Sequence, residues 1–231
     1  MATLGWWARS ITVLDTETTG VNTAQDRIVS LAVVRVAPSG AVEPGSLATL
    51  VDPGVPIPAD AAAIHGITTE RARAEGARPA DALRAAASLL ARCRDEGAPL
   101  VIYNAPFDWP LLAAEARRHS VAVPAVPLFD PLLVDRHCDR YRRGSRRLAD
   151  VAAHYGVRLE AAHGAEADAV AAAGVVRALV SAFPEDLAHV SVADLQVRQA
   201  HWYAQWRDSL NEYWRRRGDP RRNTTDWPVG A

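Results

Sequence analysis

Residues 11–20, ITVLDTETTG, join a short apolar run to two carboxylates, Asp15 and Glu17. The apolar part is rich in β-branched residues, which predicts a buried strand that ends at Asp15. Two carboxylates about 4 Å apart repel each other by about 4 kcal/mol at an effective dielectric constant of ~20. Such a pair is either solvated in an exposed acidic turn or held together by a bound cation.

Outward from this stretch, the pattern predicts a mixed α/β core. Residues 27–36 and 43–51 are expected to form two more strands, which makes the first three strands a meander, and residues 51–68 to form a Pro-rich loop. Further elements are expected at 79–97 (helix), 99–104 (strand), 106–120 (helix), 126–141 (a short strand leading into a helix), 146–157 (helix) and 164–183 (helix).

The composition indicates one large domain, or a domain with an extension. The 231 residues are 49% hydrophobic, enough for a full core. The net charge of −1, from 26 basic and 27 acidic residues, does not by itself indicate a nucleic-acid-binding protein. Every basic residue is Arg, which binds phosphate bidentately but is also favoured by an Ala- and Arg-rich genome.

The two cysteines, Cys93 and Cys138, are not spaced as metal ligands and fit a reducing compartment. The N-terminal residues lack the apolar region of a signal peptide, and the Ala-rich tract at 169–183 is too short to span a bilayer. These features predict a cytoplasmic protein with no membrane partner.

Further acidic residues and a histidine lie beside other predicted elements. Asp108 lies in the first turn of a helix directly after an apolar strand, where a carboxylate also complements the helix dipole. His163 and Asp168 are five residues apart, in a position that would also suit a solvated loop. Divalent cations such as Mg²⁺ and Mn²⁺ prefer oxygen ligands of this kind.

Taken in order, DTETTG (15–20), YNAPFD (103–108) and HGAEAD (163–168) resemble the three motifs of the DEDDh 3′–5′ exonuclease family, to which the proofreading epsilon subunit of bacterial DNA polymerase III belongs. The segments at 62–68 and 129–157 resemble the family's connecting segments. The resemblance covers about residues 8–183. One position departs from it: many relatives have His where this chain has Tyr103.

The resemblance implies an RNase H-like α/β fold with a mixed five-stranded sheet flanked by helices. It also implies a site with two Mg²⁺ or Mn²⁺ ions, held by Asp15, Glu17, Asp108 and Asp168, with His163 as the general base. His189 precedes Asp194 by the same five residues, but it follows the long helix at 164–183 and lies outside the core, so His163 is preferred.

Further expectations concern the residues that contact the substrate. Thr18, Thr19 and His65 could contact the 3′-terminal nucleotide. Asn104 could bond a phosphate or simply cap the following helix, and Phe107 could stack on a base or pack in the core. Six Arg in residues 135–147 form either a solvated face or a patch that tracks phosphates.

The chain therefore divides into an exonuclease domain, 8–184, and a helical Trp- and Arg-rich C-terminal extension, 185–231. Residues Trp202, Trp206, Leu210 and Trp214 recur every four positions and form an apolar helical stripe. That stripe could pack on the domain, dock a protein partner or a second copy, or stack on single strands.

The leading hypothesis is a metal-dependent exonuclease that acts on single-stranded or frayed 3′ ends, with DNA favoured over RNA. The motifs do not separate proofreading, repair trimming and RNA 3′-end trimming. A non-catalytic nucleic-acid-binding module of the same fold is the second class. A phosphatase of the Asp-x-Asp type is disfavoured, because Glu17 replaces its second Asp and the chain has no Lys.

Overall fold

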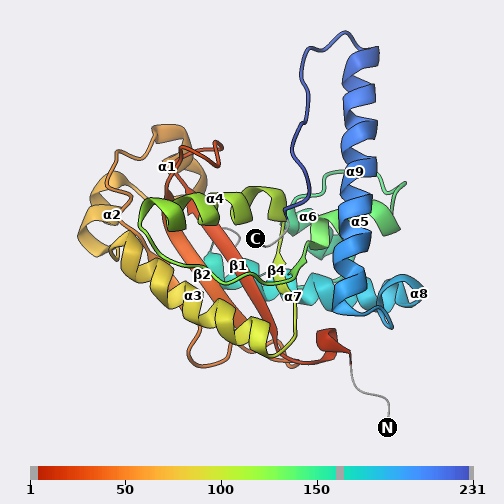
Figure 1. Ribbon diagram of the computed structural model, residues 1–231, viewed down its shortest axis with the longest axis horizontal. Coiled ribbons are helices and arrows are strands. Elements are labelled where there is room, and N and C mark those ends of the chain that lie inside the picture. The colour runs from red at the N-terminus through yellow and green to blue at the C-terminus, as the bar shows by residue number, and fades with distance from the viewer. Residues whose placement is uncertain (1–4, 160–163, 229–231) are drawn as a thin grey trace.

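The computed structural model in Figure 1 describes residues 5–159 and 164–228 of the chain. Within those residues, a five-stranded mixed sheet has the order β3-β2-β1-β4-β5. The central strand β1 is antiparallel to β2 and parallel to β4. The predicted meander and the RNase H-like five-stranded sheet are both confirmed. The strands are β1 (Ile11–Thr18), β2 (Ile28–Val36), β3 (Leu47–Leu50), β4 (Leu100–Ile102) and β5 (Leu128–Phe129).

Helices cover both faces of the sheet (Figure 1). Strand β2 is buried at all nine of its residues, as expected of a near-continuous apolar run between two helical layers. The long helix α7 packs on β1 and β2, while α3 and α4 pack on the opposite face. The helices of this part are η1 (Trp6–Ala8), α1 (Ala59–His65), α2 (Thr69–Glu75), α3 (Pro79–Asp95), α4 (Ala105–Arg118), α5 (Pro131–Cys138), α6 (Leu148–His154) and α7 (Ala165–Ala182).

The prediction of a loop over 51–68 is wrong for its second half, where α1 forms. Its sequence ADAAAIH is dominated by Ala, the best helix former, and the prolines stand before the helix, where they do not interrupt it. Gly66 ends the helix in the left-handed conformation, with φ 73°. Ile57 and Ala61 then pack with Val29 in a small satellite core.

The C-terminal extension is helical only in its first part, α8 (Pro184–Leu187) and α9 (Val192–Arg216). Residues 217–228 form no helix and run back beside α9 (Figure 1). Gly218, with φ 67°, and Pro220 account for the end of the helix. Trp227 is buried in the main core, so the returning segment is anchored at its end.

Helix α9 closes the edge of the sheet at β5. The side chains of Gln196 and Gln199 accept hydrogen bonds from the backbone N–H groups of Leu128 and Asp130, at 2.9 and 2.8 Å, and both donate to the Leu128 carbonyl. Side-chain amides thus take the place of a sixth strand. Trp202 is also buried, so the extension is packed on the sheet domain. No helix within the described ranges is both long and apolar enough to span a bilayer.

Candidate active site

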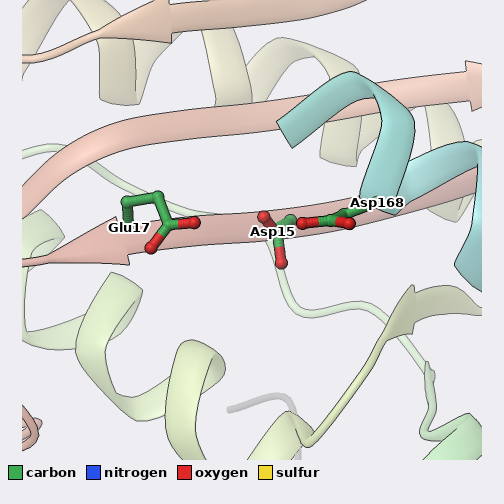
Figure 2. Close-up of side chains that lie close together, drawn as sticks. All are labelled: Asp15, Glu17 and Asp168. Atoms are coloured by element: carbon green, nitrogen blue, oxygen red, sulfur yellow. The ribbon is translucent and has the colours of Figure 1, made fainter. Parts of the chain in front are cut away.

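Three carboxylates meet where β1 passes the first turn of α7. Asp15 and Glu17 are separated by one residue on β1, so the alternation of the strand turns both toward the same face, the one that α7 covers. Asp168 comes from the first turn of α7. Ligand oxygens of the three side chains all lie within 4.8 Å of one another. Figure 2 shows the carboxyl groups of Glu17 and Asp168 turned toward Asp15 from its two sides.

The surroundings of Asp15 in this cluster oppose the ionisation of its carboxyl group. Burial raises the pKa of Asp15 well above its ordinary value, and the charges of Asp108, Glu17 and Asp168 raise it further. A divalent cation between these oxygens would favour their ionised form, because its positive charge offsets the repulsion among the carboxylates. The donor set, all carboxylate oxygens, fits Mg²⁺ or Mn²⁺.

Asp108 lies near this cluster but is not among the three clustered carboxylates. It sits in the first turn of α4, buried, and accepts a 2.5 Å hydrogen bond from the Thr16 hydroxyl. By the same alternation, Thr16 points to the face opposite Asp15 and Glu17. Burial raises the pKa of Asp108 to about 7, although the bond from Thr16 lowers it. The Thr16 contact was not predicted, since no sequence pattern pairs these two residues.

A second buried carboxylate, Asp130, holds the turn that delivers Asp108. Its two oxygens accept the backbone N–H groups of Asn104 and Ala105, at 3.0 and 3.1 Å, just before α4. Asn104 itself adopts the left-handed conformation, with φ 72°. Asp130 also caps α5 through Leu132. The sequence offered a signal for that cap, Asp followed by Pro at the first helical position, but not for the contact across the sheet.

The residues expected near the 3′-terminal nucleotide differ in their surroundings. Thr19 is buried, and its hydroxyl is already used, donating to Asp26 and accepting from the backbone N–H of Arg27. The Thr18 hydroxyl donates to the Gly20 carbonyl at 2.7 Å. His65 accepts from the Ile67 N–H at Nδ1. Burial lowers the pKa of its ring, and a hydrogen bond with the Thr18 backbone opposes this.

Around the second motif, Phe107 packs against the main core, and Asn104 is the N-cap residue of α4 without a side-chain capping bond. Tyr103 donates its hydroxyl hydrogen to the Arg146 carbonyl at 2.6 Å. It therefore ties the second motif to the Arg-rich segment after α5. His163 lies outside the residues that the structure describes. His189 is exposed, between α8 and α9.

A cleft of about 740 Å³ opens beside the carboxylates. It is lined by Asp15 and Asp168 on one side and by residues of the Arg-rich segment on the other. Among its other lining residues are Tyr103, Asn104, Arg136, Arg146 and Arg147. Carboxylates for a cation therefore face guanidinium groups that can bind phosphate.

The chain matches the model of the family described as Exonuclease (RNase_T) over residues 12–176. Among curated proteins, it is 42% identical over 103 residues to the DNA polymerase III subunit epsilon-like protein of Rhodobacter capsulatus, a match that covers 42% of this chain and 13% of that protein. It is 29% identical over 160 residues to the PolC-type DNA polymerase III of Streptococcus thermophilus, covering 69% of this chain and 10% of that one. The chain thus matches only about a tenth of the length of these relatives.

Among solved structures, Escherichia coli exonuclease I in complex with a dT13 oligonucleotide is similar with a TM-score of 0.64 and 24% identity, over 77% of this chain and 42% of that one. This likeness shows the shared fold, and the family match covers most of the chain. With its three ordered motifs, the chain belongs to the exonuclease family, and within it to the DEDDh 3′–5′ type.

Proposed function

We propose that the chain hydrolyses phosphodiester bonds at the 3′ ends of single-stranded or frayed nucleic acid, releasing nucleoside 5′-monophosphates, with DNA as the favoured substrate. The observation that carries the proposal is the cluster of Asp15, Glu17 and Asp168 at the mouth of a cleft lined with Arg. The catalytic unit is proposed to be residues 8–184, with 185–231 as an extension.

Asp15, Glu17 and Asp168 would hold the cation of the nucleophile. Asp15, with Asp108 acting mainly through water, would hold that of the leaving group, with Mg²⁺ or Mn²⁺ as the ions. When bound, two such ions stabilise the charge that develops on the attacking and leaving oxygens. What the chain itself contributes is a set of oxygens already fixed by β1, α4 and α7, so little reorganisation accompanies the reaction.

His163 is proposed as the general base, which accepts the proton of the attacking water. An imidazole with an ordinary pKa near 6.5 can do this at neutral pH, and such a base contributes about 10²–10⁴-fold. Thr18, Thr19, His65, Asn104 and Phe107 are proposed to contact the terminal nucleotide. The hydrogen bond of the His65 ring with the Thr18 backbone, which places these two residues side by side, supports this for His65. Thr19 has the weakest support, because its hydroxyl is committed to Asp26.

The preference for DNA rests on the relatives, which are named as DNA polymerase III components, and on exonuclease I, which was solved with dT13. The 2′-hydroxyl is the group that distinguishes RNA from DNA at such a site. A direct comparison of the two sugars is therefore part of the test.

The test is a time course with 5′-labelled single-stranded DNA and RNA of the same sequence, with Mg²⁺, with Mn²⁺ or with EDTA. We expect stepwise shortening from the 3′ end that stops in EDTA and is faster on DNA. Faster shortening of RNA would reassign the chain to RNA end trimming. Binding without shortening would indicate a non-catalytic module.

Two matched pairs of variants identify the residues responsible. Asp15→Asn should abolish shortening, whereas Asp81→Asn, in an exposed surface pair with Arg84, should not change it. His163→Ala should slow turnover by at least about 10²-fold, whereas His189→Ala should leave it unchanged. Full activity of Asp15→Asn would refute the assignment, and the opposite result for the two histidines would move the base to His189.

A further inference from the structure

A second cleft, of about 610 Å³, lies between α5 and α9, outside the carboxylate cluster. It adjoins the carboxylate cleft, because Arg136 and Arg146 line both of them. Helix α9 supplies one wall with Trp202 and Trp206, and α5 supplies the other with His137. Arg136 and Arg146 therefore stand between the cleft at Asp15 and the cleft at the C-terminal extension.

The charge where the two clefts meet is positive and mostly uncompensated. The buried Asp135 accepts hydrogen bonds from Arg142, Arg146 and the Tyr155 hydroxyl, so its charge is shared among these three donors. Within the described residues, no carboxylate lies within 4.0 Å of Arg136, Arg140 or Arg147. Asp208 also lines the cleft, but it pairs with Arg207 at 3.0 Å.

Arg136 is the most informative of these residues, because it is only partly exposed yet unpaired. Burial lowers the pKa of its guanidinium, and the nearby charges of Asp130 and Asp135 offset this only in part. An anion in the cleft would relieve this cost, since a desolvated charge is stable only when it is paired. The guanidinium lies 4.4 Å from the centre of the Trp206 ring, so its direction is fixed by a cation–π contact.

Flat aromatic faces accompany these charges. The rings of His137 and Trp202 are stacked, with centroids 4.2 Å apart and planes 14° from parallel. Trp206 is half-buried and lines the open cleft. Alternating guanidinium groups and aromatic rings are the combination that binds single strands, because every base has a π-face and every linkage a phosphate.

We propose that the α5–α9 cleft binds the single strand upstream of its 3′ end, with phosphates on Arg136 and Arg140 and a base against the part of Trp206 that Arg136 leaves open. Arg147, in the carboxylate cleft, would bind a phosphate nearer the 3′ end. The proposal rests on the proposed function, which places the 3′ end at Asp15. The shared lining of the two clefts favours a nucleic-acid strand over an acidic peptide, since a strand whose 3′ end lies at the carboxylates can extend past Arg136 and Arg146 into the α5–α9 cleft.

The experiment measures binding separately from cleavage. Fluorescence anisotropy in EDTA gives the Kd of the full chain for oligo-dT of ~4 and of ~16 nucleotides, lengths that bracket the site sizes of single-strand-binding folds. The wild type should bind the longer strand at least about tenfold more tightly. The double variant Arg140→Gln/Trp206→Ala should lose most of that gain, about tenfold in Kd, and Arg140→Gln alone should reduce the dependence of log Kd on log salt by about 0.7.

The matched control is Trp214→Ala/Arg221→Ala. These residues form another guanidinium–indole pair at the far end of α9, at 5.0 Å, and line neither cleft. This control should keep the wild-type gain with length. Circular dichroism and thermal melting establish that both double variants are folded before their Kd values are compared.

The outcomes separate this proposal from the proposed function. If the wild type shortens DNA but the Arg140/Trp206 variant keeps the full gain with length, the cleft proposal fails and the exonuclease assignment stands. If the wild type binds long strands through the cleft but shortens neither DNA nor RNA, the exonuclease assignment fails alone. An acidic peptide that binds the wild type but not the double variant, with the gain for DNA unchanged, would overturn the strand as the ligand.

Discussion

At the scale of single residues, Asp15 shows why the carboxylate cluster is a candidate cation site. Its carboxyl group is buried and lies close to three other acidic side chains. Burial and each of these charges oppose its ionisation. In the first turn of α4, burial likewise opposes the ionisation of Asp108 and raises its pKa to about 7. Without a cation, therefore, these groups retain protons at a pH where an ordinary carboxyl group has lost them.

The first prediction follows from the sign of these shifts. A divalent cation binds the ionised carboxylates, so it must displace their protons, and its affinity should rise with pH through the region near 7 in which Asp108 loses its proton. Titration calorimetry with Mn²⁺ should show roughly tenfold tighter binding per pH unit for each proton released below that pH. Asp15→Asn should bind weakly at every pH. Equal affinities at pH values well below and well above 7 would contradict the prediction.

Gly174 lets α7, the element that carries Asp168, approach its neighbour closely. A Cβ atom at this position would lie 2.6 Å from Cγ1 of Val157, a stiff β-branched side chain after α6. Ala in place of Gly normally stabilises a helix interior by about 1 kcal/mol, but overpacking costs about 1–3 kcal/mol. The steric cost of the contact with Val157 therefore outweighs the stability gained from the higher helix propensity of Ala.

Accordingly, Gly174→Ala should lower the free energy of unfolding, by about 1 kcal/mol, in urea titrations. Within a Val157→Ala background, the same substitution should raise it, because the clash is gone and the propensity gain remains. The expected result is that the change in the free energy of unfolding caused by Gly174→Ala has opposite signs in the two backgrounds. Destabilisation of equal size in both backgrounds would show that Val157 is not the cause.

Arg35 links three elements through a half-buried ion pair network. From β2 it bonds Glu43 at 3.1 Å and, at the end of α3, Glu96 at 2.8 Å, and it is itself 5% exposed. The Ser10 hydroxyl and Arg35 lower the pKa of Glu43. Bonds from Arg35 and Arg92 lower that of Glu96 against the opposing effect of burial.

Because these two pKa values are lowered by folding, the network contributes stability above the ordinary pKa of 4.5 and loses it as pH falls below that value. Arg35→Leu should therefore lower the free energy of unfolding by about 1–3 kcal/mol at pH 7, with a smaller difference near pH 3. Arg71→Leu, which removes an exposed pair with Glu75, should change it by at most about 0.5 kcal/mol at either pH. A constant difference across pH for Arg35→Leu would exclude the ionic explanation.

The elements were predictable wherever one local signal dominated. The apolar run of β2 and the helical period of α3 specify their structures almost alone. Helix α1 was missed because three prolines in 53–58 obscured the Ala-rich segment that follows. In the site, Asp15, Glu17 and Asp168 could be selected from motifs, whereas the Thr16–Asp108 bond could not, since it depends on how α4 docks across β1.

At the scale of the whole molecule, the C-terminal extension is connected to the site by a chain of hydrogen bonds. Gln199 of α9 accepts the Asp130 N–H, and Asp130 accepts the N–H groups of the turn that begins α4. Asp108 lies in the first turn of that helix. The extension therefore supports the placement of Asp108 through Asp130, which lies 69 positions before Gln199 in the chain.

The last prediction tests this connection with Gln199, which is fully buried. Gln199→Ala removes the partner of the Asp130 N–H and one partner of the Leu128 carbonyl, and a buried group left unsatisfied costs about 1–3 kcal/mol. We expect the free energy of unfolding to fall by that amount and the turnover of single-stranded DNA to fall at a temperature where the variant remains folded. Val197→Ala, at an exposed position of the same helix, should change neither. Loss of stability with unchanged turnover would show that α9 closes the edge of the sheet without positioning Asp108, because the turn held by Asp130 would then tolerate the loss of its support.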